Sequence, residues 1–255
     1  MNKQINPAEL VPMDIFVGQE PIDVDLVYQQ ADHPRNIFEE QLYQDNARLW
    51  LHKDLAKTVI LASRILLWHG SQNHKEIWHM QLKDGLRTTD TQEAMAETKI
   101  VKANPHWKDP EHMYLSPPGT GAHPRGMAID ITPITRQGTL IPMGTEFDDM
   151  SEQSGRSEKN LPAEILQNRA LLEKSVGEAA ILCDQDILAL PTEWWDFRRL
   201  SDHYDQFAPL SDADLPPQMQ MTNTIQNDIA DFPESHFEKL AEDITSAINQ
   251  HNDYL

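Results

Sequence analysis

The chain has 255 residues, of which 39% are hydrophobic and 24% charged, and these values are ordinary for one globular domain with a sizeable core. Its 41 acidic and 21 basic residues give a formal net charge of −20 at pH 7. A chain this acidic lacks the Lys and Arg surface that binds nucleic acid or an anionic membrane, so we expect neither partner.

The N-terminal segment, up to about residue 48, is rich in Pro, Asp and Asn. It has no apolar run long enough for a signal peptide, and nowhere does the chain show the roughly 18 consecutive apolar residues of a membrane span. We therefore expect a cytoplasmic protein. Residues 22–28 are predicted to form a short strand that ends at Tyr28, and residues 31–38 a loop.

Two helices and a strand are predicted in the next part of the chain. Apolar residues recur every three or four positions over 45–68, with Asp45 or Asn46 available as the N-cap. A strand is expected over 79–83, and a capping box that begins at Thr89 starts the second helix.

Residues 100–118 include four prolines and show no hydrophobic periodicity, which predicts a loop. We expect this loop to cover a functional site. His106 and His112 lie within it without a ligand spacing to each other, so both are predicted to be solvated.

The segment 119–132, GTGAHPRGMAIDIT, combines a flexible loop with a strand. Apolar residues alternate with small or polar ones over 127–132, so the strand has an apolar face and Asp130 lies on the other. The glycines and prolines of the preceding loop can aim His123 from outside a regular element. Imidazole and carboxylate are both zinc ligands, so this pair is half of a metal site or, alternatively, a surface His and a capping Asp.

The chain then turns at 137–138 into a predicted hairpin partner at 139–143. A polar loop is expected over 151–160 and a helix over 161–181. The single cysteine, Cys183, cannot form an internal disulfide and is predicted to be a buried thiol.

A short linker over 184–191 leads to Glu193, which by itself is a surface residue beside a core tryptophan pair. Residues 1–210 are predicted to form one domain and residues 211–255 a C-terminal extension. A capping box at Ser235 opens a helix in this extension, which we expect to be a packing arm, with an interface helix as the alternative.

Two boxes of this chain resemble the signature of a known family. His123, Gly126, Ala128 and Asp130 match HxxGxAxD, the pattern of the D-Ala-D-Ala dipeptidases (VanX type). These belong to the M15 or LAS zinc peptidases, which also include DD-carboxypeptidases and the hedgehog domain. The second family box, ExWH, reads EWWD here, so its glutamate is Glu193 and an aspartate replaces its last histidine.

The resemblance implies an α+β fold in which helices flank a small, mainly antiparallel sheet with a metal at one face. It implies a zinc ion bound by His123, Asp130 and, provisionally, Asp196. Glu193 would be the acid/base that accepts a proton from the attacking water and passes it to the leaving amine. The neighbouring tryptophans are suited to raise its pKa toward that task.

Weaker elements extend the resemblance over about residues 22–200. Tyr28 and Asp148, the latter in MGTEFDDM, look like family residues that bind the amino group of the dipeptide. Arg87, in DGLRT, looks like an arginine that stabilises the oxyanion at the scissile carbonyl. Without the family, such an arginine is commonly a surface ion-pair partner.

The aspartate at 196 is where the chain departs from the family pattern. With a second aspartate among the ligands, the summed charge of ion and ligands falls from about +1 to about zero, which weakens water activation and favours harder ions such as manganese. Three interpretations remain open. Asp196 is a working ligand, another histidine such as His203 or His79 replaces it, or the site is degenerate.

We predict a zinc-dependent D-Ala-D-Ala dipeptidase that hydrolyses small D-amino-acid dipeptides. The alternatives are a peptidoglycan carboxypeptidase or endopeptidase of the same fold, and a non-catalytic metal-binding relative. An enzyme acting on larger cell-wall peptides is expected to carry an export signal, which this sequence does not show. An idle site has no chemical need for a transition-state arginine together with a general base, which favours catalysis.

Overall fold

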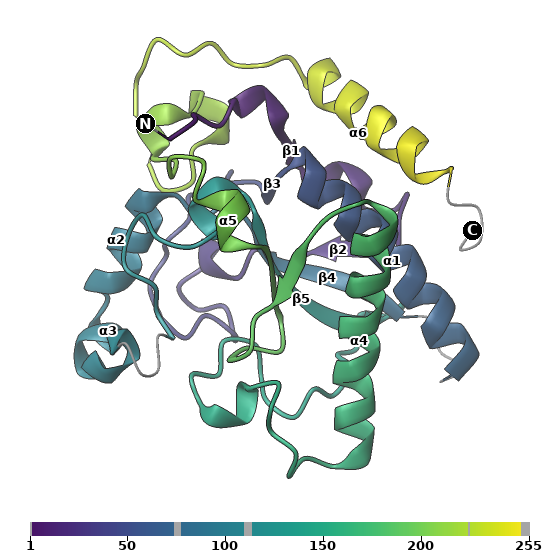
Figure 1. The fold of residues 1–255 in the computed structure, drawn as a ribbon. Helices are drawn as coiled ribbons and strands as arrows, with labels where there is room; N and C mark the ends of the chain where they lie inside the picture. Colours follow the sequence, from purple (N-terminus) through teal and green to yellow (C-terminus); the bar gives the residue numbers. More distant parts are fainter. Residues whose placement is uncertain (1, 74–77, 110–113, 224, 251–255) are drawn as a thin grey trace.

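The computed structural model describes residues 2–73, 78–109, 114–223 and 225–250. The fold is α+β, as expected, with a five-stranded sheet in the order β2-β4-β5-β7-β6 and a two-stranded sheet of β1 and β3 (Figure 1). β2 runs parallel to β4, and the other neighbouring strands are antiparallel. The strands are Leu10–Pro12 (β1), Ile22–Val24 (β2), Trp50–His52 (β3), Trp78–Asp84 (β4), Ala128–Thr135 (β5), Ile187–Ala189 (β6) and Asp196–Arg199 (β7).

Helices flank this sheet, and Figure 1 shows α1 and α4 side by side, away from α2 and α3. The helices are Lys53–Asn73 (α1), Thr89–Glu97 (α2), Lys99–Ala103 (α3), Ala163–Leu182 (α4), Ser201–Tyr204 (α5) and Glu234–Ile248 (α6). Short 3-10 turns cover Pro7–Glu9, Met13–Phe16, Val27–Gln29, Pro105–Lys108, His123–Arg125, Glu152–Ser154, Asp212–Asp214 and Pro217–Met219. α1 packs against both α4 and β4, so the long helices bury one flank of the sheet.

β5 is the central strand, and it confirms the strand predicted around Asp130. It lies between β4 and β7, and every residue except Thr135 is buried. Ile129 and Ile131 enter the hydrophobic core, whereas Asp130, only 2% exposed, lies on the face that carries the polar site.

Two predicted elements are shorter than expected near the N-terminus. α1 begins at Lys53 rather than at residue 45, because Trp50–His52 pairs with β1 as a strand and cannot be helical. The strand predicted over 22–28 ends at Val24, and Tyr28 lies in a buried 3-10 turn. Pairing with distant segments overrode the local pattern in both places.

The predicted hairpin partner over 139–143 is not a strand. Leu140 forms one isolated antiparallel bridge with Ile134, and the pairing there is limited to two flanking backbone hydrogen bonds, from Thr135 N–H to the Thr139 carbonyl and from Ile141 N–H to the Pro133 carbonyl. Conversely, the linker predicted over 184–191 contains β6, the strand next to β7 at the edge of the sheet.

The segment 100–118 is less irregular than predicted, since it contains the end of α3 and a 3-10 turn. His106 is exposed, as predicted, and His112 lies outside the described residues. The cap of α2 is Thr88 rather than Thr89: the hydroxyl of Thr88 accepts the backbone N–H of Thr91.

α6 packs on α1, as Figure 1 shows, and its buried residues join the main hydrophobic core. Phe237, Ile244 and Ile248 form its buried stripe. Its N-cap is Pro233, with no side-chain cap, so the predicted capping box at Ser235 is wrong. Across the described part of the chain, none of the helices has the length and apolar character needed to span a membrane.

Candidate active site

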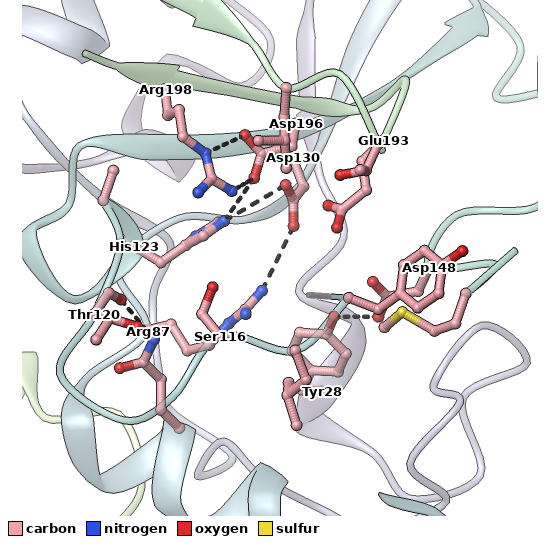
Figure 2. Close-up of a pocket in the computed structure, with 18 of the residues that line it drawn as sticks. Tyr28, Arg87, Ser116, Thr120, His123, Asp130, Asp148, Glu193, Asp196 and Arg198 are labelled. Atoms are coloured by element: carbon pink, nitrogen blue, oxygen red, sulfur yellow. Dashed lines mark hydrogen bonds and ion pairs between the residues drawn. The ribbon is translucent and has the colours of Figure 1, made fainter. Parts of the chain in front are cut away.

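A cavity of about 220 Å³ gathers residues from distant parts of the chain (Figure 2). The residues that line it include all those given a site role from the sequence: Tyr28, Arg87, His123, Asp130, Asp148, Glu193 and Asp196. Pockets for drug-sized ligands measure roughly 300–1,000 Å³, so this cavity suits a small ligand.

Three aspartates lie in one row across three neighbouring strands. Asp84, the last residue of β4, is opposite Asp130 in β5, and Asp130 is opposite Asp196 at the start of β7. Each is at most 2% exposed. Like charges opposite one another in a buried row are unfavourable and require nearby cations, and two arginines and a histidine surround this row.

A tight loop brings His123 to this row. The loop contains the 3-10 turn His123–Arg125 and ends at Gly126, whose φ of 62° is a left-handed conformation that favours glycine. The Arg125 guanidinium donates to the backbone carbonyls of Gly121 at 2.6 Å and Phe207 at 2.8 Å. These hydrogen bonds fix the loop, so the imidazole has a defined position.

The backbone also orients the His123 ring. Nδ1 donates to the Gly85 carbonyl at 2.8 Å, so that Nε2 faces the carboxylates. Nε2 lies 3.3 Å from Oδ2 of Asp196 and 3.6 Å from Oδ1 of Asp130. Two ligand atoms 2.0–2.2 Å from a tetrahedral ion are roughly 3.3–3.6 Å apart, so these three side chains could hold a zinc-sized ion.

The protonation state of His123 also depends on the negative charge of the buried aspartates. Burial and Arg87 lower the pKa of His123, but Asp130 and Asp196 outweigh them and raise it to about 10. Without a metal, a proton on the imidazole therefore balances part of the negative charge at this position.

Asp130 has a buried oxygen that no described residue satisfies. Its Oδ1 has no hydrogen-bond partner, and its Oδ2 is 3.7 Å from Nη2 of Arg87. Burial raises the pKa of Asp130, although His123 opposes this shift. A buried polar atom without a partner is costly and calls for an explanation, and a missing metal bond supplies one.

Asp196 is paired with an arginine that the sequence reading did not include. Arg198, two residues along β7 and hence on the same strand face, donates from Nε to Oδ1 of Asp196 at 2.7 Å and from Nη2 to Oδ2. Burial opposes ionisation, but Arg198 and His123 hold the pKa of Asp196 well below its usual range. The pair is neutral overall, as a histidine at this position would be.

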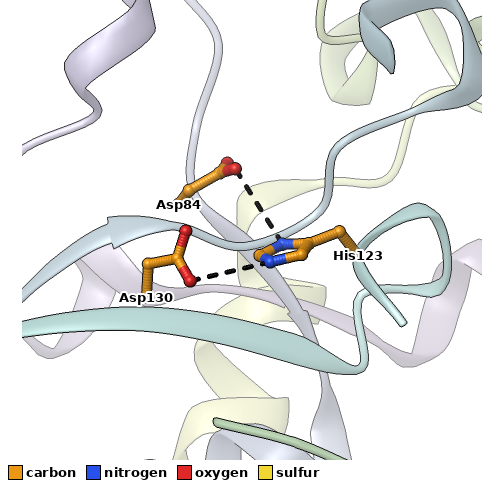
Figure 3. A group of neighbouring side chains, drawn as sticks. All are labelled: Asp84, His123 and Asp130. Atoms are coloured by element: carbon orange, nitrogen blue, oxygen red, sulfur yellow. Dashed lines mark ion pairs between the residues drawn. The ribbon is translucent and has the colours of Figure 1, made fainter. Parts of the chain in front are cut away.

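Asp84 also lies close to His123 and Asp130, and the ligand atoms of the three are within 4.8 Å of one another (Figure 3). Asp84 approaches Nδ1, at 3.9 Å, whereas Asp130 approaches Nε2 on the other side of the ring. One imidazole cannot direct both nitrogens to a single ion, and Nδ1 already donates to a carbonyl. Around Nε2, by contrast, Asp130 and Asp196 both face the same nitrogen.

Asp84 instead positions Arg87. Its Oδ2 accepts from Nε of Arg87 at 2.7 Å and lies 2.5 Å from Nη2, and its Oδ1 accepts the hydroxyl of Tyr43 at 2.5 Å. Both carboxylate oxygens are thus used. The Arg87 side chain, 13% exposed, lines the cavity, where its guanidinium can meet negative charge on a ligand.

Asp148 and Tyr28 form the opposite side of the cavity (Figure 2). The Tyr28 hydroxyl donates to Oδ2 of Asp148, and burial raises the pKa of Asp148 to about 7 although Tyr28 opposes the shift. Asp148 has a φ of 62°, which is uncommon outside glycine and tends to mark functional positions. Arg169 of α4 stabilises this loop by donating to the carbonyls of Met143, Gln153 and Gly155.

Glu193 lies just before β7, on the side of Asp130 away from Arg198 (Figure 2). Burial, with the charges of Asp196 and Asp130, raises the pKa of Glu193 well above its usual value. The next residue, Trp194, is buried and donates from Nε1 to Oγ1 of Thr145 at 2.8 Å, which anchors the segment. Glu193 is therefore a half-buried carboxyl group suited to exchange protons.

Three contributors to the site were missed from the sequence. Arg198 follows the EWWD box on the same strand face, a spacing that could have revealed it. Asp84 was noted only as a motif residue, and the role of the Gly85 carbonyl depends on backbone geometry that no side chain signals. Neither His79 nor His203 lines the cavity, so neither takes the place of Asp196.

Comparison with known proteins agrees with these features. The sequence model of the family described as "D-ala-D-ala dipeptidase" (Peptidase_M15) matches residues 8–211. The D-alanyl-D-alanine dipeptidase of Escherichia coli (strain K12) is 30% identical over 190 residues, covering 74% of this chain and 84% of that protein. The D-alanyl-D-alanine dipeptidase of Enterococcus faecium is 32% identical over 158 residues, covering 60% and 68%.

Among solved structures, the L-Ala D-Glu endopeptidase ChiX of Serratia marcescens is similar with a TM-score of 0.34 and 16% identity, over 60% of this chain and 84% of that one. This structural similarity is too low to bear on the site or its substrate.

Proposed function

The chain belongs to the D-Ala-D-Ala dipeptidase family of M15 metallopeptidases, and from this premise we propose that it hydrolyses small D-amino-acid dipeptides, D-Ala-D-Ala foremost. The observation that carries the proposal is a small cavity in which a metal-type ligand set, an acid/base candidate and an ammonium-type acceptor meet. We also keep the prediction that the reaction takes place in the cytoplasm.

His123, Asp130 and Asp196 would hold the metal. Their donor chemistry suits zinc, their spacing suits a tetrahedral ion, and the unsatisfied Oδ1 of Asp130 would gain a partner. When bound, zinc supplies an activated water molecule and polarises the scissile carbonyl.

The positive charge of Arg198 balances the additional negative charge that Asp196 brings to the metal site. With the guanidinium included, a divalent ion, two aspartates and one arginine sum to about +1, the same as for the usual pair of histidines and one aspartate. We therefore propose zinc as the working metal, with manganese as the alternative that two carboxylate ligands favour.

Glu193 and Arg87 would carry the chemistry on either side of the carbonyl. Glu193 accepts the proton of the attacking water and donates it to the leaving amine, and its raised pKa brings it toward the range in which one group can do both. Arg87, held rigidly by Asp84, donates to the oxygen on which negative charge develops.

Asp148 and Tyr28 would bind the free amino group of the substrate. A carboxylate is the natural partner of an ammonium group, and the Tyr28 hydroxyl fixes the orientation of Asp148. A site that binds the free amino group beside the scissile bond admits one residue on the N-terminal side of that bond. A dipeptidase requires this spacing.

The direct test is release of D-Ala from D-Ala-D-Ala by the purified protein with zinc and, separately, with manganese. We expect turnover with at least one metal, and its loss in Glu193→Gln. Longer peptidoglycan peptides ending in D-Ala-D-Ala serve as the comparison, and preference for them would favour a carboxypeptidase or endopeptidase instead. No hydrolysis of any of these substrates by a folded, metal-loaded protein would refute the proposal.

A further inference from the structure

Two hydrogen-bond donors at the cavity wall have no role in the mechanism above. Arg198 uses Nε and Nη2 on Asp196, and its third nitrogen, Nη1, has no hydrogen-bond partner among the described residues. The Ser116 hydroxyl also has no partner within that part of the chain. Both residues line the cavity.

These two donors border the same open place. A Cβ built on Gly121 would lie 3.7 Å from Nη1 of Arg198 and 3.8 Å from Oγ of Ser116. A ligand atom cannot take the Cβ position itself, but the absence of a side chain at Gly121 leaves the space beside both donors open to a ligand. Two donors around one such place suit a group with two acceptor oxygens, such as a carboxylate.

The place lies on the far side of the cavity from the ammonium-type acceptor. Figure 2 shows Arg198 and Asp148 at opposite sides, with Asp130 between them. A short peptide whose amino group meets Asp148 and whose scissile carbonyl lies near Asp130 would therefore extend its other end toward Arg198.

Local charge makes Arg198 the natural partner for an anion at this end. The cavity wall is rich in carboxylates, and the whole chain has a net charge of −20, so an incoming carboxylate is repelled over most of the surface. The second guanidinium of the wall, Arg87, is bound to Asp84 and lies 5.9 Å from the ring of Tyr28, on the ammonium side.

We propose that Nη1 of Arg198, assisted by the Ser116 hydroxyl, binds the C-terminal carboxylate of the dipeptide. The inference rests on the proposed function and deepens it. Asp148 fixes the distance from the amino end and Arg198 fixes the distance from the carboxyl end, so the site selects a substrate of two residues. Arg198 is then a specificity-determining residue that also holds a metal ligand.

The test compares D-Ala-D-Ala with its C-terminal amide, which lacks the negative charge. In the unmodified protein we expect kcat/KM to favour the free carboxylate by about 10- to 100-fold, the range of a charge-assisted hydrogen bond. In Arg198→Gln this preference should fall to about threefold or less. If Arg198 acts only through Asp196, both substrates lose the same factor and the preference persists, which would overturn the inference.

Two further variants separate carboxylate binding from loss of structure. Arg198→Lys keeps a positive charge beside Asp196 but loses the fork geometry, so we expect turnover of the amide to fall less than in Arg198→Gln while the preference drops. Arg199→Gln changes the next residue, which does not line the cavity, and should leave the preference unchanged. An unchanged preference in Arg198→Lys together with Arg198→Gln would contradict the proposal.

Binding to Glu193→Gln gives a measurement that does not depend on turnover. By calorimetry we expect this variant to bind D-Ala-D-Ala at least tenfold more tightly than the amide, and Glu193→Gln with Arg198→Gln to bind both about equally. This outcome supports carboxylate recognition even if the unmodified protein hydrolyses neither compound, a result that would refute the proposed function alone. Equal binding of the two compounds by Glu193→Gln refutes the inference.

Discussion

The pairing of Asp196 with Arg198 predicts that restoring the family histidine alone will harm the protein. Asp196→His removes a carboxylate that accepts two hydrogen bonds from Arg198, at side-chain exposures of 1% and 12%. The guanidinium is then left without its counter-charge beside His123. Stability should fall even though the new residue is a better zinc ligand.

The size of the effect follows from the geometry. Charges about 4 Å apart interact by about 4 kcal/mol at an effective dielectric constant near 20, and breaking a buried pair by removing one partner costs about 3–5 kcal/mol. Relief of repulsion between Asp196 and Asp130, which face each other across β5 and β7, returns less than about 1 kcal/mol. Loss of the ion pair should dominate, and the net loss of about 2–5 kcal/mol should lower the melting temperature by roughly 4–20 °C.

A second substitution, Arg198→Gln, tests whether the unpaired guanidinium causes the loss of stability. Combined with Arg198→Gln, Asp196→His should recover most of the lost stability, because the unpaired charge is gone, and the double variant should bind zinc at least as tightly as the original protein. Thermal unfolding with a chelator and zinc titration against a competing dye measure the two quantities. Arg199→Gln in the Asp196→His background is the matched control and should recover nothing. The reasoning fails if Asp196→His is as stable as the original protein, or if the two substitutions are additive.

Three other outcomes follow from the site. Without metal the pKa of His123 is raised to about 10, so zinc must displace a proton from the imidazole at pH 7. Zinc affinity should therefore rise about tenfold per pH unit below about pH 10. Calorimetry in buffers of different ionisation enthalpy measures the proton release, and no release would contradict this prediction. Burial raises the pKa of Asp148 to about 7, so KM for the dipeptide should fall as pH rises through about 7 and the carboxylate ionises. If Asp148→Asn shows the same dependence of KM on pH, the dependence does not arise from Asp148. Gly85→Ala would place Cβ 2.7 Å from the Trp50 carbonyl oxygen, so it should destabilise the protein by about 1–3 kcal/mol and weaken zinc binding. Gly177→Ala, whose Cβ would have nothing within 4 Å, should be neutral or stabilising. Equal unfolding temperatures for the two variants would contradict the packing explanation.

Much of the fold follows from local patterns in the sequence. The alternating residues around Asp130 form a strand, and the periodic segments 45–68 and 161–181 contain most of the long helices Lys53–Asn73 and Ala163–Leu182. The segments that differ are those in which a distant partner decides the outcome. Trp50–His52 carries a helical pattern but pairs with β1, and β6 lies in a stretch that reads as a linker.

The candidate site divides in the same way. The seven residues given a site role from the sequence, from Tyr28 to Asp196, stand in local motifs, and all of them line the cavity. The contacts between the site residues could not be predicted from the sequence, because they depend on the register of β4, β5 and β7. This register aligns three aspartates that are far apart along the chain.

The sequence by itself indicated seven side chains whose chemistry suits a metallopeptidase, because imidazole, carboxylate and guanidinium groups have the same donor and acceptor properties in any fold. Only the tertiary structure decided how their charges balance. The effect of Arg198 on Asp196, and of the Gly85 carbonyl on His123, depends on distances of about 3 Å that strand register and loop packing set. The aspartate at position 196 therefore looks like a lost histidine in the sequence, whereas in the folded protein Arg198 balances its charge.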